Sequence, residues 1–442
     1  GQLVIDSVYD LDGVDDSPAG ISQHATPGTP AYLQRPARFL RIMQPVPIPD
    51  DDVFEIPDFA VGVSRASGFR EILGYVPVEP DGSVTVTIPA NSPFDFEVLD
   101  GSARRIGPRH NYWLQLGAGE VRQCTGCHAG STDVPHGRRD SQPPSANPGA
   151  VALPEGILGF PATNSSELYA LEAGDTMAEV WDQHRPIDNT TAVERELSLA
   201  PTFIDEWHAP TVDPDTPVSG LEYPAEWTDI PVERALIVNN FDAGQPSRIV
   251  INYIDHIQPI WERSRDARLD SDNNPVDTCV GCHSTEGNTL VAAGQLELTS
   301  EASDIDPDHY RSYRELLSQD QEQWLDAADA FGERTRLCTI VDDEGEELTI
   351  SETVPLSSSM RAGSANGSTR FFNCFEGGTC GPPDAPPLPD NCVEEGMAVP
   401  STRNTVDHVG LLTAPELRLI SEWLDIGAQY YNNPFDDRLV ED

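Results

Sequence analysis

Basic residues are scarce in this sequence of 442 residues. Its 27 Lys and Arg stand against 74 Asp and Glu, which gives a formal net charge of −47 at pH 7. A nucleic-acid surface needs excess positive charge to meet the phosphates, so nucleic acid is excluded as a partner. The acidic excess is typical of a protein kept soluble in salty surroundings, where ions screen its self-repulsion. A surface that attracts cationic partners is the alternative.

Long hydrophobic runs are also missing. No stretch of roughly 18 or more apolar residues occurs, so no transmembrane segment is predicted. The chain starts at Gly1 without an initiator Met, a basic n-region or an apolar h-region, as expected of a mature product whose leader or a larger N-terminal part has been removed. No Ser/His/Asp arrangement, phosphate loop or dinucleotide fingerprint is evident. The 7 Trp, 14 Phe and 11 Tyr can build ordinary cores, and the length suggests two or three domains.

Four of the eight Cys residues lie in two copies of one pattern, CTGCH at 124–128 and CVGCH at 279–283. Cys-x-x-Cys-His is the attachment signature of c-type haem: both thiols form thioethers to the porphyrin, and the next imidazole reaches the iron. The pattern therefore predicts two haem c groups, held by Cys124, Cys127, Cys279 and Cys282. Zinc knuckles or thioredoxin-like sites are the alternative, but neither needs the adjoining His.

The compartment follows from this chemistry, because bacteria attach haem covalently outside the cytoplasm. We expect an extracytoplasmic protein, extracellular or at the cell surface, with the periplasm as the alternative. In such a compartment the other four Cys are expected to form two disulfides that staple a loop-rich insertion. These residues are Cys338, Cys374, Cys380 and Cys392. Three pairings are possible, and a metal site is the rival interpretation.

The first part of the chain is predicted to be a small β-sandwich domain over residues 1–117. Apolar residues alternate with polar ones at 84–88 and again at 94–98, with a Pro-containing break between them, which predicts a hairpin of half-buried strands. Residues 118–245 are assigned to the first haem module, whose irregular segment, rich in Pro, Asp, Ser and Thr, would wrap the haem.

The last third is predicted to be a mainly α-helical cytochrome c domain, over residues 246–442. A helix over 251–263 precedes the second motif, and a closing helix over 411–431 starts with a capping box of Thr413 and Glu416. Helix, haem motif, distal loop and closing helix follow in the order of a cytochrome c domain, with the disulfide-stapled insertion before the closing helix. The expected fold class is a multidomain α+β protein.

Iron ligands were sought among the histidines. His128 and His283 are the proximal ligands by motif. His408 lies in the loop five residues before Thr413, where a cytochrome c domain places its distal ligand, so it is expected on the second iron, with Met397 as the alternative. For the first iron, His136 and His256 remain alternatives. Two imidazoles saturate an iron and leave no open position for substrate.

Several phrases of the sequence resemble one family. The runs HNYWLQLGAGEVRQCTGCHAG and INYIDHIQPIW, the phrase SYRELL and the ending LTAPELRLISEWLDIGAQYYNNPF are similar to the hydrazine synthase alpha-subunit-like family of multihaem c-type cytochromes. The resemblance runs from about residue 36 to 436 and is weakest in the middle. It implies a β domain followed by two haem modules in an assembly outside the cytoplasm. The reaction of the named enzyme is not implied, because fold likeness does not establish function.

These observations favour an electron-transfer protein with redox partners. The rival hypothesis is a haem oxidoreductase of peroxidase-like or nitrogen-compound type with a catalytic first haem, and a structural envelope protein is a third. Two haems on 442 residues make a poor wire within one molecule. We therefore predict that copies of the chain join head to tail in an extracellular conductive filament, since a heterologous contact that does not close a ring generates a helix.

Overall fold

We describe a computed structural model of the chain. The residues described are 1–63, 68–110, 112–130, 143–149, 151–153, 156–158, 174–184, 196–199, 207, 237–238, 247–269, 273, 275–285, 292–325, 331–341, 345–378, 389–394 and 407–439. The chain divides into two compact units. Unit 1 comprises Gly1–Val46, Arg70–Glu226 and Ile237–Val250, and unit 2 comprises Pro47–Phe69, Trp227–Leu236 and Ile251–Asp442. The predicted boundaries at residues 117 and 245 stay a prediction.

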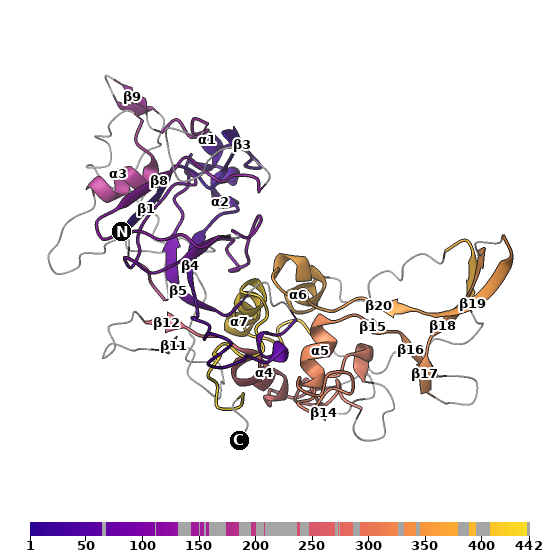
Figure 1. Cartoon of the computed structure of the whole chain (residues 1–442). Helices are drawn as coiled ribbons and strands as arrows, with labels where there is room; N and C mark the ends of the chain where they lie inside the picture. The colour runs from indigo at the N-terminus through magenta and orange to yellow at the C-terminus, as the bar shows by residue number, and fades with distance from the viewer. Residues whose placement is uncertain are drawn as a thin grey trace. The chain divides into compact units, whose positions relative to one another are not determined.

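Unit 1 contains two main sheets (Figure 1). The three-stranded sheet has the order β6 (Val84–Thr87), β1 (Gln2–Ile5) and β8 (Val121–Cys124). The five-stranded sheet has the order β11 (Ile237–Val238), β12 (Arg248–Ile249), β5 (Arg70–Pro77), β4 (Phe39–Pro45) and β7 (Asp95–Leu99). Smaller elements are the strand pairs β2 (Asp10–Leu11) with β3 (Val14–Asp15) and β9 (Val151–Leu153) with β10 (Gly156–Leu158), and the helices α1 (Ile21–His24), α2 (Pro30–Leu33) and α3 (Met177–His184).

The predicted hairpin of residues 84–88 and 94–98 is wrong. Both segments are strands, but β6 pairs antiparallel with β1 while β7 pairs antiparallel with β4 in the other sheet. The connection contains two prolines and Asn91 at a positive φ of 61°, so the chain leaves one sheet for the other there. Alternation marks a strand with one buried face, but it does not name the partner strand.

One hydrophobic core joins the two sheets of unit 1. It takes fully buried side chains from both of them, including Leu3 on β1, Val86 on β6, Ile42 on β4 and Val76 on β5. Each such side chain contributes about 1.5–3 kcal/mol when taken from water. Packing of two sheets over a shared core is the arrangement of a β-sandwich, and the predicted β-rich N-terminal region and mixed α+β character are confirmed.

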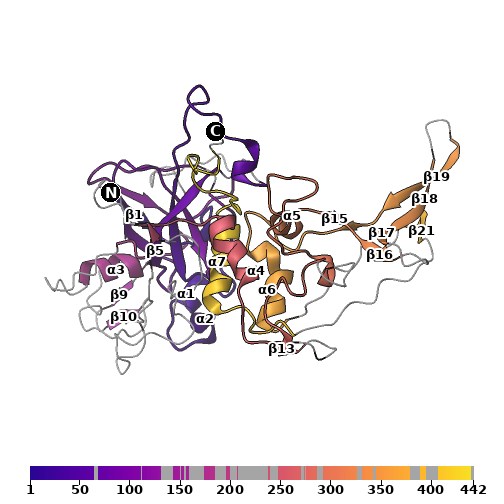
Figure 2. The same ribbon diagram turned by 90° about the horizontal axis from the view of Figure 1, so that it is seen from below.

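Unit 2 contains several short helices (Figures 1 and 2). Its helices are the π-helix η7 (Tyr253–Ile257), α4 (Gln258–Glu262), α5 (Arg311–Leu317), α6 (Thr369–Glu376) and α7 (Ala414–Asp425), with 3-10 turns η1 (Asp58–Val61), η8 (Ala293–Gln295) and η9 (Asn366–Ser368). Rings of Tyr253, Tyr313, Trp423 and Tyr430 lie 4.8–6.2 Å apart between centroids. No helix within the described residues has the length and apolar character needed to cross a bilayer.

The helix predicted over 251–263 is divided in two. Pro259 has no N–H to donate to the carbonyl of Asp255, so a regular α-helix cannot run through this point. The chain instead forms the wider turns of η7 before α4 begins. At the other end of unit 2 the predicted capping box is confirmed: the Thr413 side chain accepts from the Glu416 N–H, and the Glu416 carboxylate accepts from Thr413.

A three-stranded sheet completes unit 2, with β18 (Thr335–Val341) between β19 (Glu347–Thr353) and β21 (Cys392–Glu394). Both views show β18 and β19 as a hairpin that extends beyond the strands β15 (Asp320–Gln321) and β20 (Pro355–Leu356). Two further pairs are β13 (Arg268–Leu269) with β14 (Pro275–Val276) and β16 (Gln323–Leu325) with β17 (Phe331–Glu333).

Candidate haem-binding sites

The first Cys-x-x-Cys-His motif starts at the end of a strand. Cys124 is the last residue of β8, which pairs in parallel with β1. The Cys127 N–H donates to the carbonyl oxygen of Asp10 at 2.7 Å, and its own carbonyl accepts from the Asp12 N–H at 3.0 Å. A Cβ at Gly126 would lie 2.5 Å from the Cβ of Asp10, so this position requires glycine. The sandwich thus holds the first motif rigidly.

The motif thiols have the wrong chemistry for a thioredoxin-like site. Cys124, Cys127, Cys279 and Cys282 are half-buried and are not joined in disulfides. Burial raises the pKa of the Cys124 and Cys279 thiols and raises that of Cys127 to about 12. A reactive redox cysteine needs a lowered pKa. Among the described residues, no group of three metal-ligand atoms gathers at either motif, so the arrangement does not fit a zinc knuckle either.

His128 faces a second imidazole, that of His110. Their ring centroids lie 6.3 Å apart, with the ring planes at 82°. The Nδ1 of His128 donates to the Ala129 carbonyl at 3.3 Å. The Nδ1 of His110 lies 3.3 Å from a carboxylate oxygen of Asp95, and the Phe96 ring stacks on it at 5.2 Å. The Nδ1 of His128 is thus hydrogen-bonded, and the Nδ1 of His110 lies at ion-pair distance from the Asp95 carboxylate without a hydrogen bond.

The second motif forms a tight turn that is hydrogen-bonded to the end of α4. The Cys279 N–H donates to the carbonyl oxygen of Trp261 at 3.1 Å, and the His283 N–H donates to the carbonyl oxygen of Cys279 at 2.9 Å. Downstream, the Leu298 N–H donates to the His283 carbonyl at 2.8 Å. The imidazole of His283 thus has a fixed position at the end of the turn.

His283 faces His408 across the second site. Their ring centroids are 6.1 Å apart, with the planes at 57°. The Nδ1 of His283 donates to the Leu296 carbonyl at 3.1 Å, so its Nε2 keeps a lone pair. Burial and the neighbouring His408 lower the pKa of His283 to about 4, which keeps the ring neutral. The Phe375 ring meets His408 edge-on at 5.8 Å.

The spacing of the two pairs fits an iron between the rings. A metal–imidazole bond is about 2 Å long and a ring nitrogen lies about 1 Å from its own centroid, so two imidazoles on opposite sides of one ion have centroids about 6 Å apart. Both pairs have this spacing, and both stand beside the two thiols of a motif. The residues present therefore fit covalent haem with one His on each side.

Two other histidines named in the sequence analysis are placed differently. His256 is buried in η7, where its Nδ1 accepts a hydrogen bond from the Asn252 N–H at 2.9 Å. In the neutral ring the proton then sits on Nε2, and no lone pair is left for iron. His136 and the alternative ligand Met397 lie outside the described residues. The structure thus brings together the pair His283 and His408, and it adds His110 opposite His128, a residue that the sequence analysis did not choose.

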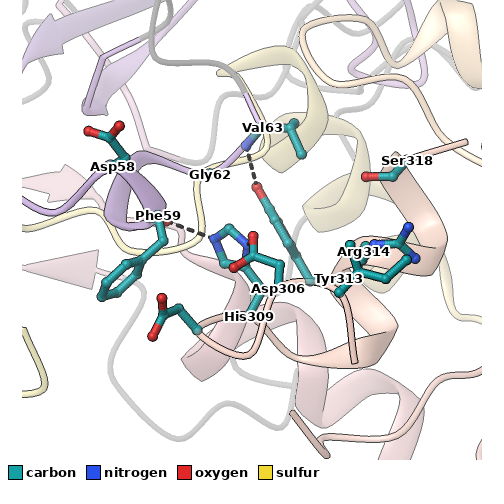
Figure 3. A pocket seen from close by; sticks show the side chains of 11 residues that line it. Asp58, Phe59, Gly62, Val63, Asp306, His309, Tyr313, Arg314 and Ser318 are labelled. Atoms are coloured by element: carbon teal, nitrogen blue, oxygen red, sulfur yellow. Dashed lines mark hydrogen bonds and ion pairs between the residues drawn. The ribbon is translucent and has the colours of Figure 1, made fainter. Parts of the chain in front are cut away.

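His309 forms polar contacts through both ring nitrogens at another place in unit 2. It lines a pocket of about 460 Å³ with Asp306 and Tyr313 (Figure 3). Its Nδ1 lies 2.5 Å from an Asp306 carboxylate oxygen, and its Nε2 lies 2.8 Å from the carbonyl oxygen of Phe59. The Tyr313 hydroxyl donates to the Ala428 carbonyl at 2.8 Å. With both ring nitrogens engaged, His309 has no free nitrogen for an iron.

One predicted disulfide is fully described. Cys338 on β18 is bonded to Cys392 on β21, and the two are 54 positions apart in sequence. Cys374 on α6 is also disulfide-bonded, whereas Cys380 lies outside the described residues. The pairing that the sequence left open is thus resolved for Cys338 and Cys392. The rival metal site is excluded for these two, because their sulfurs are joined to each other.

Comparison with known proteins bears on the first site. Residues 39–129, which include β4, β5, β7, β8 and the first motif, match the family of the hydrazine synthase alpha subunit middle domain. The predicted family resemblance is confirmed over this segment. A chain of hydrazine synthase from Kuenenia stuttgartiensis is similar at 16% identity and a TM-score of 0.43, covering 99% of this chain. The present chain corresponds to 44% of the length of that chain. No curated protein matches the sequence.

Proposed function

We propose that this protein is an extracytoplasmic c-type cytochrome that carries two covalent haems and transfers electrons. The observation that carries the proposal is the His283–His408 pair, whose centroids are 6.1 Å apart beside the two thiols of Cys279 and Cys282. The haem, when bound, supplies a one-electron couple. The thiols would attach it, the His283 imidazole is held by its hydrogen bond to the Leu296 carbonyl, and the Phe375 ring packs edge-on against His408.

The proposed architecture follows the same division. The β-sandwich of unit 1 would carry the first haem. The predicted wrapping segment up to residue 245 lies largely outside the described residues. Residues 246–442 would form a cytochrome c domain in which α4 precedes the second motif and α7 closes the fold. In support, the carboxylate of Glu416 at the start of α7 accepts hydrogen bonds from Arg265, between α4 and the motif, at 2.9 and 3.0 Å.

The decisive experiment is expression in a host with a cytochrome c maturation system. We expect two haems per chain by pyridine haemochrome assay, both resistant to acid extraction, and a low-spin spectrum in the oxidised form. A chain that exports and folds without covalent haem would refute the proposal. The rival function, a haem oxidoreductase with nitrogen-compound or peroxidase-like chemistry, is favoured only by the match to the hydrazine synthase family. It predicts a high-spin fraction whose Soret band shifts rapidly with cyanide or peroxide.

Assembly into a conductive filament is the finer part of the proposal. It is supported by the sheet of β18, β19 and β21, which exposes hydrophobic side chains to solvent. These are Ile340, Val341, Leu348 and Val393, between 37% and 65% exposed. Light scattering and electron microscopy across salt concentrations test it, because salt screens the mutual repulsion of chains with a charge of −47. A monodisperse particle of 48.2 kDa chain mass at every salt level would refute the filament.

A further inference from the structure

We propose that His110 is the sixth ligand of the first haem and that Asp95 is the residue that positions it. This assignment rests on the proposed function and adds to it, because it gives the first iron two imidazole ligands. His110 lies in the loop after β7, 14 residues before the first Cys of the motif. The sequence suggested His136, which lies outside the described residues, or His256 for this position.

The geometry of the ring pair suits a shared iron. A separation of 6.3 Å between the centroids of His110 and His128 matches one iron between two Nε2 atoms. An edge-to-face contact of two aromatic rings covers a similar range of distances, about 4.5–7 Å. The surroundings of the rings favour ligation, because the Nδ1 of His128 donates to the Ala129 carbonyl and the Nδ1 of His110 lies 3.3 Å from a carboxylate oxygen of Asp95.

A buried carboxylate lies behind His110. Asp95 is on β7 with a side chain 2% exposed, and it accepts hydrogen bonds from the guanidinium of Arg70 at 2.6 Å and from the Phe96 N–H at 2.7 Å. An oxygen of this carboxylate also lies 3.3 Å from Nδ1 of His110, without a formed hydrogen bond. A carboxylate near the second ring nitrogen of a metal-binding histidine favours the tautomer with its proton on that nitrogen. Asp95 is placed to have this effect on His110.

An aromatic ring packs against His110. Phe96 follows Asp95 on β7 and stacks on the imidazole at 5.2 Å with an angle of 22° between planes. Strand β7 therefore supplies both a neighbouring carboxylate and an apolar support for one imidazole. β7 itself is fixed by five residue pairs with β4. A surface histidine without a ligand would not need such support, since its ring is stabilised by water.

The assignment has a consequence for the function. With His110 and His128 on opposite sides, the first iron has no open position, so unit 1 carries an electron rather than binding a substrate. The buried negative charge of Asp95, 3.3 Å from Nδ1 of His110, would favour the oxidised state of an iron bound by that ring.

The test uses the full-length dihaem protein. His110→Ala should convert half of the oxidised haem to a high-spin form that binds cyanide or imidazole, while the haem content stays at two per chain. His110→Met should restore a low-spin haem with a higher potential, because thioether ligation favours the reduced state. His24→Ala, which removes another buried histidine of unit 1, is the control for general disruption and should leave both haems low-spin.

Asp95→Asn separates positioning from ligation. Asn keeps the shape of Asp95 but removes its negative charge, so both haems should remain low-spin while the potential of one of them rises. Two low-spin haems in His110→Ala would overturn the assignment and leave the dihaem proposal intact. A wild-type chain without covalent haem would overturn both. An unchanged potential in Asp95→Asn would overturn the role of Asp95 alone.

Discussion

The two candidate sites share a motif but not a scaffold. In unit 1 the motif extends a strand of a sandwich, and the facing His110 comes before it in the sequence. In unit 2 the motif is a turn hydrogen-bonded to the end of the short helix α4, and the facing His408 comes more than a hundred residues after it. The Cys-x-x-Cys-His motif therefore predicts the histidine on one side of a haem site. The residue on the other side depends on which segment of the chain the fold brings opposite the motif.

The largest expected effect is loss of one haem from one unit. Replacing Cys279 and Cys282 by Ser should give a chain with one haem in place of two, because neither thioether can form. Replacing Cys124 and Cys127 should remove the other haem. Intact mass and haemochrome assays count the haems. If either double variant lost both haems, the two sites would not mature independently and the comparison between them would fail.

The next effect is a change of coordination in unit 2 alone. His408→Ala should leave two haems attached and convert the second to a high-spin form, because the Nε2 opposite His283 is gone. His408→Met should recover a six-coordinate iron at a higher potential. Electron paramagnetic resonance of the oxidised protein separates the two spin states. An unchanged spectrum in His408→Ala would remove His408 from the site.

How far the sequence predicts these sites differs between the units. His408 was predicted because its place before the capping box of Thr413 and Glu416 is a local signal, and that box exists in the structure. His110 carries no such signal, since its link to the motif runs through the pairing of β7 with β4 and of β8 with β1. Its nearness to the first motif within the HNYWLQL run was the one available clue.

The same reason explains the errors in the fold. The strands near residues 84–88 and 94–98 were predicted from alternation, but their partners β1 and β4 lie far away in sequence, so the predicted hairpin was wrong. Local patterns such as caps, turns and half-buried strands are readable from a sequence. Pairings between distant strands are not, because the free energy of a pairing depends on the whole sheet.

A third effect is expected in the stability of unit 2. Replacing Cys338 and Cys392 by Ser removes a link across 54 residues, which corresponds to a loss of about 4 kcal/mol in the chain-entropy account. The loss should appear in denaturant unfolding followed at the second haem. The transition followed at the first haem should not move. Equal shifts at both haems would show that the two units unfold as one.

The smallest effect concerns the helix caps. Glu416 caps α7 and also accepts from Arg263 and Arg265, whereas Glu179 caps α3 in unit 1 through Thr176. We expect Glu416→Gln to cost about 2 kcal/mol, as for hydrogen bonds to charged groups. We expect Glu179→Gln, the matched control, to cost about 1 kcal/mol or less. Thermal unfolding of both variants measures their losses of stability. Equal losses would show that Arg263 and Arg265 add nothing to the cap of α7.

The Glu416 variant also has a pH signature. Burial opposes ionisation of this carboxyl, but the hydrogen bonds from Arg265 and Thr413 outweigh it and lower its pKa below the ordinary 4.5. A group whose pKa is lowered by folding stabilises the native state above its unfolded pKa, and this contribution is lost as the pH falls through the folded value. Stability of unit 2 should therefore decline below about pH 4.5, and Glu416→Gln should flatten that decline.

The buried ion pairs have a practical consequence for handling the molecule. All 27 basic residues are arginines, because the sequence contains no lysine. Several of these arginines form buried ion pairs: Arg41 with Glu97, Arg70 with Asp95 and Arg265 with Glu416. Their side chains are at most 10% exposed. Amine-directed dyes and cross-linkers thus find no side chain to react with. Attachment to an electrode must use carboxylates, and a positively charged, amine-coated surface will adsorb the protein at low salt.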